Sequence, residues 1–139
     1  MAGSEQVGET PTPGVELPWV GIVDDDASLR AALARALRVN GIRVETFGSA
    51  EEYLQRRSGG EPVCIVLDIH LGGLSGLDLR DRLEAEGIAP PIIFITAHDD
   101  MLTGALGSSA CGYLRKPFDV QALVSLLRPH CTHVSTEPS

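Results

Sequence analysis

Residues 63–68 read Val-Cys-Ile-Val-Leu-Asp, a continuous apolar run that ends abruptly at a carboxylate. A β-rich run without polar alternation predicts a strand that is buried on both faces of its sheet. Trp19 to Val23, Pro91 to Ile95 and Cys111 to Arg115 have the same character, and Ile42 to Phe47 alternates apolar and polar residues. The chain is therefore expected to contain five strands.

Helical patterns separate these runs, with apolar residues spaced three or four positions apart. The helix after the first run carries Leu29, Leu33 and Leu37 and stops at Asn40-Gly41, a common C-terminal signal. The other helices are predicted from a capping box at Ser49 to Glu52, around Leu79 and Leu83, over Asp99 to Ser109, and around Leu123, Leu126 and Leu127. Strands alternating with helices indicate an α/β fold: a doubly wound, five-stranded parallel sheet with five helices.

The polar residues at the strand ends are the candidates for function, because ligands of doubly wound folds bind beyond the carboxyl ends of the strands. These residues are Asp24, Asp25, Asp68, Thr96 and Lys116. Asp26, next to the first pair, suits the N-cap of the following helix. Carboxylates crowded at one edge raise one another's pKa values unless a cation lies among them, and Mg²⁺ prefers oxygen ligands of this kind. An added ammonium and hydroxyl would let the pocket bind a phosphoryl group, which a carboxylate can accept as an aspartyl phosphate.

Composition limits the other possibilities. The 139 residues suit one domain at 18–130, with a polar, flexible N-terminal tail at 1–17 and a C-terminal tail at 131–139. There is no signal-peptide pattern and no apolar run of about 20 residues, so we expect a cytoplasmic protein without membrane contact. Eleven basic against nineteen acidic residues give a net charge of −8, which argues against direct nucleic-acid binding. Cys64 and Cys111 lie in apolar runs and are expected to be reduced core thiols.

Four stretches together resemble the receiver domains of two-component response regulators: IVDDDASLR, IVLDIHLGGLSGLDL, IIFITAHDD and GYLRKPF. Their order and spacing match over roughly residues 19–128. Receivers of the nitrogen-fixation regulator type are the most similar, judged from VDDD, TFGSAEEYL and ITAH. The resemblance implies a flavodoxin-like fold and a phosphorelay switch that catalyses only its own phosphorylation and dephosphorylation.

The resemblance also implies roles for individual residues. Asp68 would accept a phosphoryl group from a sensor histidine kinase or a phosphotransfer protein. Asp25 and Asp68 would bind Mg²⁺, for which Mn²⁺ could substitute, together with the backbone carbonyl of His70, while Asp24 would act through water. In the same way Lys116 would pair with the phosphoryl oxygens.

Two further residues would transmit the signal. Thr96 would move toward the new phosphate, and Tyr113, three residues before Lys116, would follow it inward as an aromatic switch. A half-buried strand tyrosine without such a role is the alternative for Tyr113. The Lys116–Pro117 bond is expected to be cis, as it usually is in this family.

The sequence departs from the family in two places. The loop after Asp68 reads HLGGLSG, where the family commonly has a proline just before the first aligned glycine, so Gly72-Gly73 should make the loop more flexible. The interval from Thr96 to Lys116 is slightly short, and it contains Gly104 and Gly107. We therefore expect a shortened fourth helix with local disorder between Asp99 and Cys111.

Two histidines stand two residues after Asp68 and Thr96, at positions that tune phosphate lifetime in the family. We expect His70 and His98 to make the decay of phospho-Asp68 change between about pH 6 and pH 7.5, as imidazoles titrate. Two exposed loop histidines without a kinetic role are the equally plain alternative.

Other functions stay open at this point. A receiver-like interaction module that works without phosphorylation would have the same fold. Phosphatases of the haloacid dehalogenase type also use an aspartyl phosphate, but their acidic pair normally follows the lysine, whereas Asp99-Asp100 precedes Lys116. The cognate kinase and the output partner or effector domain cannot be named from the sequence. Because the fourth helix normally forms the output face, its shortening favours a monomer or weak dimer.

Overall fold

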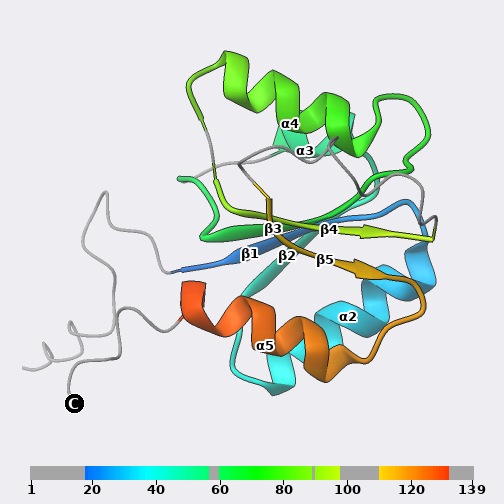
Figure 1. The fold of residues 1–139 in the computed structure, drawn as a ribbon, viewed down its shortest axis with the longest axis vertical. Coiled ribbons are helices and arrows are strands. Elements are labelled where there is room, and N and C mark those ends of the chain that lie inside the picture. The colour runs from blue at the N-terminus through cyan, green and yellow to red at the C-terminus, as the bar shows by residue number, and fades with distance from the viewer. Residues whose placement is uncertain (1–17, 57–59, 89, 98–109, 132–139) are drawn as a thin grey trace, which may run out of the picture.

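The fold is a five-stranded parallel sheet between two layers of helices (Figure 1). The structure is a computed structural model that describes residues 18–56, 60–88, 90–97 and 110–131. The strands are β1 (Val20–Val23), β2 (Val44–Phe47), β3 (Cys64–Asp68), β4 (Ile92–Thr96) and β5 (Ala110–Arg115). They pair in the order β2-β1-β3-β4-β5, all parallel, which confirms the predicted doubly wound sheet.

Helices cover both faces of this sheet. The helices are α2 (Ala27–Val39), α3 (Ala50–Arg56), α4 (Gly76–Ala85) and α5 (Val120–Cys131). α2 and α5 lie on one face, and α3 and α4 lie on the other (Figure 1). The helix and the local disorder expected over 99–109 lie outside the described residues. None of the helices in the described part is both long and apolar enough to span a bilayer.

The central strands are apolar throughout because their alternate side chains enter two separate cores. On β3, Cys64 and Val66 pack toward α2 and α5, whereas Ile65 and Leu67 pack toward α3 and α4. All four side chains have 0% exposure. Burying an aliphatic side chain of this size stabilises the fold by about 1.5–3 kcal/mol. The missing polar alternation in residues 63–67 thus follows from burial on both faces.

The boundaries of α2 agree with the sequence signals. Asp26 is its N-cap, and the carboxylate accepts hydrogen bonds from the N–H groups of Ser28 at 3.0 Å and Leu29 at 3.1 Å. Such a cap contributes about 0.5–2 kcal/mol. At the other end Asn40 is the C-cap, and Gly41 adopts a φ of +81°, a left-handed conformation that glycine accepts without penalty.

The capping box expected at Ser49 forms only in part. The Ser49 hydroxyl accepts a hydrogen bond from the Glu52 N–H at 2.9 Å, but the Glu52 carboxylate accepts from Gly48 at 2.7 Å instead of from Ser49. A complete capping box that was not predicted starts α4, between Ser75 and Asp78.

The prediction that Cys111 is a core thiol was wrong, because its side chain is exposed. β5 is the last strand of the sheet order, and its residues alternate in exposure, with Cys111 on the exposed side.

Cys64 is buried as predicted, and burial raises the pKa of its thiol to about 12. The Lys116–Pro117 bond is cis, also as predicted.

Candidate functional site

The parallel register brings the predicted polar residues to one edge of the sheet. Val23, the last residue of β1, pairs with Leu67 of β3. Asp24 and Asp68 are the next residues along these two strands, and they therefore lie at neighbouring positions. Asp68 pairs with Ile95, which places Thr96 at the next position of the adjacent strand. Thr96 in turn pairs with Arg115, the residue before Lys116. Four strand ends separated by up to 92 residues therefore meet at this edge.

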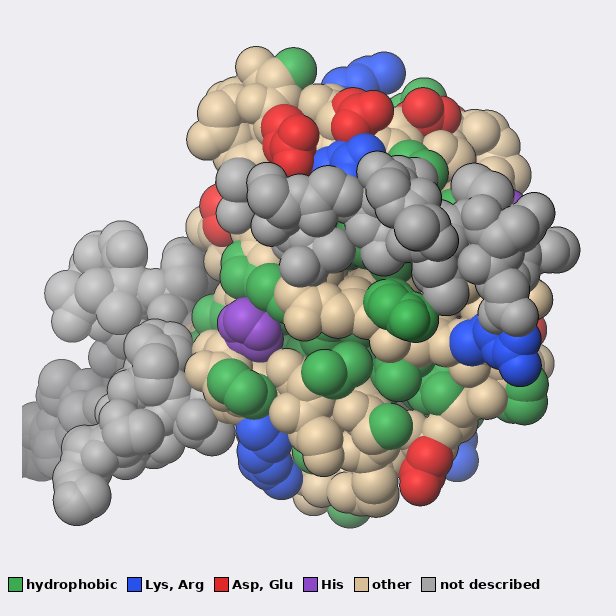
Figure 2. Space-filling view, viewed as in Figure 1, with side chains coloured by type: hydrophobic (Ala, Val, Ile, Leu, Met, Phe, Trp, Pro, Cys, Tyr) green, Lys and Arg blue, Asp and Glu red, His purple; other side chains and the backbone are tan. Residues whose placement is uncertain are grey.

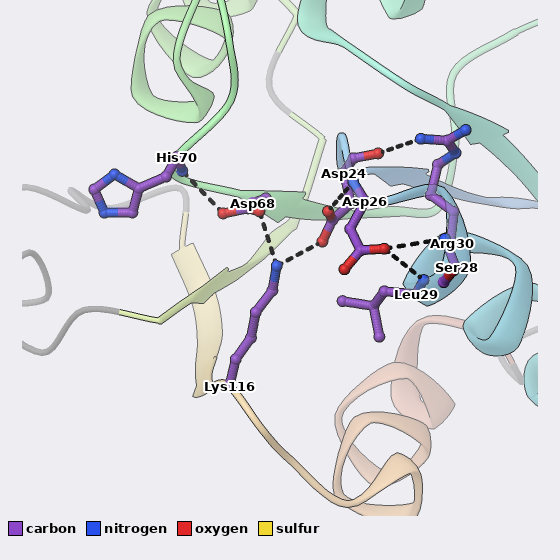
Figure 3. A network of polar contacts seen from close by, with 8 residues as sticks. All are labelled: Asp24, Asp26, Ser28, Leu29, Arg30, Asp68, His70 and Lys116. Carbon is purple, nitrogen blue, oxygen red and sulfur yellow. Dashed lines mark hydrogen bonds and ion pairs between the residues drawn. The ribbon is translucent and has the colours of Figure 1, made fainter.

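The ammonium of Lys116 lies between two carboxylates (Figure 3). Its Nζ is 2.9 Å from Oδ2 of Asp24 and 2.9 Å from Oδ2 of Asp68. The other oxygens are fixed by the backbone: Oδ1 of Asp24 accepts the Asp26 N–H at 2.8 Å, and Oδ1 of Asp68 accepts the His70 N–H at 2.9 Å. Both carboxylates are therefore held in one orientation before any ligand arrives.

Burial sets the electrostatics of this cluster. Asp24 is 0% and Asp68 4% exposed. Desolvation raises the pKa of Asp68 above its ordinary value, and the charge of Asp24 adds to the rise, although Lys116 and the His70 N–H oppose it. For Lys116, desolvation lowers the pKa, but the two carboxylates outweigh it and the net pKa is raised. The Lys116 ammonium therefore keeps its proton in the pocket. The ionised Asp68 carboxylate is still destabilised by burial, and a further cation beside it would reduce this free-energy cost.

The donor set fits a divalent cation. Asp24, Asp25 and Asp68 each offer a carboxylate oxygen, and these oxygens lie within 4.8 Å of one another. Within the part of the chain that the structure describes, no group makes a hydrogen bond to the buried Oδ2 of Asp24, whose contact with Lys116 is an ion pair. Asp25 is exposed and faces solvent. A hard cation such as Mg²⁺ prefers carboxylate ligands of this kind and keeps several waters, which the open side at Asp25 allows.

The remaining predicted residues lie around this cluster. Thr96 is fully buried at the end of β4, and its carbonyl accepts the Lys116 N–H at 2.7 Å. His70 follows Asp68 with an exposed side chain. Tyr113 is 52% exposed on β5, and both the switch role and the alternative of a half-buried strand tyrosine stay predictions. His98 lies outside the described residues, and the tuning role expected for it and His70 stays a prediction.

Two residues beside the site were missed in the sequence. Nη1 of Arg30 donates a hydrogen bond to the Asp24 carbonyl at 2.7 Å, linking the first turn of α2 to the end of β1. Gly76 starts α4 directly against Asp68, and a Cβ at this position would lie 2.3 Å from the Asp68 carbonyl oxygen. The spacing of a glycine eight residues after Asp68 was the available signal for Gly76, whereas nothing in the sequence alone indicates the contact of Arg30 with a carbonyl.

Comparison with known proteins agrees with this geometry. The family model of the response regulator receiver domain matches residues 20–128. Nodulation protein W of Bradyrhizobium diazoefficiens is 44% identical over 107 residues, which cover 76% of this chain and 47% of that protein. The DNA-binding transcriptional regulator NtrC of Escherichia coli is 34% identical over 116 residues, or 82% of this chain and 25% of that regulator. The chain thus spans half or less of the length of these two relatives.

Solved structures show the same fold. The response regulator StyR superposes with a TM-score of 0.77 at 39% identity, covering 84% of this chain and 60% of that one. FixJ-N superposes with a TM-score of 0.74 at 29% identity, covering 86% and 97%. Because the family model covers most of the chain and the acidic cluster lies at the expected sheet edge, the chain belongs to the response-regulator receiver domain family of two-component signalling.

Proposed function

We propose that this receiver, spanning residues 18–130 between two tails, is a phosphoacceptor switch that takes a phosphoryl group onto Asp68 from a histidine kinase or phosphotransfer protein. The observation that carries the proposal is the buried Asp68 carboxylate, held 2.9 Å from Lys116 beside two further carboxylates. In the transfer, an Asp68 oxygen forms a bond to phosphorus as the phosphorus–nitrogen bond of the donor phosphohistidine breaks.

The neighbouring side chains would compensate the charge that arrives with the phosphoryl group. The Lys116 ammonium, now shared by two carboxylates, is within reach of phosphoryl oxygens on Asp68. Asp25, Asp68 and the His70 carbonyl would hold Mg²⁺ or Mn²⁺, with Asp24 contributing through water. When bound there, the ion would supply positive charge beside the phosphoryl oxygens.

The response would begin at Thr96 and Tyr113. The Thr96 hydroxyl would donate a hydrogen bond to the new phosphoryl group, since Thr96 lies next to Asp68 across the β3–β4 pair. Tyr113 pairs with Phe94 on the neighbouring strand and is exposed, so an inward rotation would bury a large aromatic side chain. The switch would thereby change the surface around β5.

The output of such a switch would be another protein or domain. Relatives such as NtrC are named as transcriptional regulators and are much longer than this chain. On the face shown in Figure 2, acidic and basic side chains lie together over α4, and the other basic side chains of this face lie apart from one another. The net charge of −8 supports output through a protein partner rather than direct contact with nucleic acid. The proposal places this receiver in the cytoplasm, as a monomer or weak dimer.

Incubation with acetyl phosphate and Mg²⁺, followed by intact-mass spectrometry, tests the proposal. We expect one added phosphoryl group that is absent without metal and absent in Asp68→Asn. A folded, Mg²⁺-binding protein that takes no phosphoryl group from acetyl phosphate or a phosphohistidine protein would favour the phosphorylation-independent interaction module. Steady turnover of a small phosphomonoester would instead indicate a phosphatase.

A further inference from the structure

The loop between β3 and α4 contains two adjacent glycines, Gly72 and Gly73. Glycine has the largest conformational freedom in the unfolded chain, so ordering this loop costs more than ordering an average one. The same loop contains His70, whose backbone carbonyl is proposed above to bind the cation. A contact that fixes the conformation of this loop therefore also fixes where the His70 carbonyl lies relative to Asp68.

The two ends of the loop are held by backbone groups. Near its start, the His70 N–H donates to Oδ1 of Asp68 at 2.9 Å. At its end, the Gly76 N–H donates to the Ile69 carbonyl at 2.9 Å. These contacts close the loop on itself but leave its glycine-rich middle to be fixed by other parts of the molecule.

The middle of the loop is held by Glu51, which lies in the first turn of α3. Its Oε2 accepts a hydrogen bond from the Leu74 N–H at 3.0 Å, across 23 positions of sequence. Gly73 has a φ of +78°, and a Cβ at this position would lie 2.6 Å from the same Oε2. The carboxylate thus occupies the space that any side chain at position 73 would need.

The charge of Glu51 suits this contact. The Leu74 N–H holds the pKa of Glu51 below its ordinary value, and the charge of Arg82 on α4 adds a smaller effect in the same direction. The carboxylate is therefore ionised at neutral pH, and a hydrogen bond to an ionised acceptor is stronger than one to a neutral acceptor. Three segments meet here: the start of α3, the loop and α4.

We infer that Glu51 is a positioning residue for the chemistry at Asp68: it fixes the Gly72–Gly73 loop through the Leu74 N–H and so presents the His70 carbonyl to the cation. The inference rests on the proposed function of the site. Glu51 touches neither the cation ligands nor the phosphoryl group in this scheme, and its contribution passes through the backbone of the loop.

Three variants separate this role from a general effect on stability. Glu51→Ala removes the acceptor, whereas Glu51→Gln keeps an oxygen that can accept the Leu74 N–H. Gln55→Ala is the matched control, since Gln55 is an exposed residue one turn further along α3. The readouts are hydrogen exchange of the Leu74 amide by NMR, the Mg²⁺ dissociation constant, the rate of phosphorylation by acetyl phosphate and the urea midpoint.

For Glu51→Ala we expect faster exchange at Leu74, with weaker Mg²⁺ binding and slower phosphorylation by about 2- to 5-fold, the usual range for one exposed hydrogen bond. The urea midpoint should stay unchanged because Glu51 is solvent-exposed. Glu51→Gln should restore most of the Mg²⁺ affinity and rate, and Gln55→Ala should match the wild type in all four readouts.

Wild-type Mg²⁺ affinity and phosphorylation rate in Glu51→Ala would overturn the positioning role while leaving the proposed function intact. Equal losses in Glu51→Ala and Gln55→Ala would also overturn it, since the effect would then belong to α3 as a whole. A wild-type chain that neither binds Mg²⁺ nor takes a phosphoryl group would instead refute the proposed function, and the positioning role with it.

Discussion

The close approach of Gly76 to Asp68 gives a prediction that can be worked out from the structure. A Cβ on Gly76 would lie 2.3 Å from the Asp68 carbonyl oxygen and 3.0 Å from both the Asp68 carbonyl carbon and the Ile69 Cα. All three are backbone atoms, so no side-chain rotation can relieve the contact. Gly76→Ala therefore forces the start of α4 and the end of β3 apart.

The size of the effect follows from the distance. Ordinary contact begins near 3.4 Å, so the methyl carbon and the oxygen must separate by about 1.1 Å, the difference between 3.4 Å and 2.3 Å. Overpacking of this kind costs about 1–3 kcal/mol. Alanine also lowers the conformational entropy of the unfolded chain, which stabilises the folded state by about 0.4–1 kcal/mol. We expect the free energy of unfolding to fall by about 1.3 kcal/mol, which is about 2 kcal/mol of overpacking less about 0.7 kcal/mol of entropy.

The same displacement should slow the reaction at Asp68. A misplacement of about 1 Å at a reacting group can cost about 100-fold in rate. We expect Gly76→Ala to be phosphorylated by acetyl phosphate about 10- to 100-fold more slowly than the wild type. Urea unfolding with a constant m-value measures the stability, and intact-mass spectrometry over time measures the rate.

Gly72→Ala is the matched control because it adds the same methyl group four residues earlier, in the loop that leads into α4. Among the described residues, nothing lies within 4 Å of the point where its Cβ would stand, and its φ is not left-handed. Its stability should equal the wild type or rise by up to about 1 kcal/mol. If Gly76→Ala unfolds at the same urea concentration as Gly72→Ala and reacts at the wild-type rate, the packing argument is wrong.

Three further predictions concern the charged cluster. Asp68→Asn should raise the free energy of unfolding at pH 7 without metal, because burial above all raises the folded-state pKa of Asp68 and the ionised carboxylate therefore destabilises the folded chain. Because the folded pKa lies above the unfolded value of 3.8, this gain should vanish in urea titrations below pH 3.8. Mg²⁺ at 100 times its dissociation constant should stabilise the wild type by about 2.7 kcal/mol in thermal melts. Asp25→Asn, which replaces an exposed residue, should remove this stabilisation by Mg²⁺. Lys116→Met should lower the metal-free unfolding free energy at pH 7 by about 1.5–3 kcal/mol, because two buried carboxylates lose their cation; an unchanged urea midpoint would contradict this.

The residues at the strand ends could be predicted because the strands themselves could be identified from the pattern of apolar residues. Apolar runs that end at Asp68 and before Asp24 identify strands, and parallel strands bring their carboxyl ends to one edge. The cap at Asp26 was predictable for a similar reason, since it depends on the local chain alone. Features of this kind require no knowledge of which strands are neighbours.

Features that depend on the spatial order of elements were not predictable in this way. Cys111 looked like a core residue because its strand is apolar. It alternates with Gly112, which faces Leu126 of α5, so Cys111 points to the opposite face of β5 and is exposed there. The contact of Glu51 with Leu74 joins two segments 23 residues apart and leaves no periodic trace in the sequence. The tight packing of Gly76 likewise depends on how α4 meets the Asp68 backbone.

The central claim is that Asp68 itself accepts the phosphoryl group, and chemical trapping tests it most directly. Borohydride reduces an acyl phosphate to an alcohol, so phospho-Asp68 would become homoserine at position 68 in peptides mapped by mass spectrometry. We predict homoserine at this position only after incubation with phosphodonor and Mg²⁺. Homoserine at another aspartate, or none in a folded protein whose melting temperature rises with Mg²⁺, would contradict the assignment of Asp68 as the phosphoacceptor.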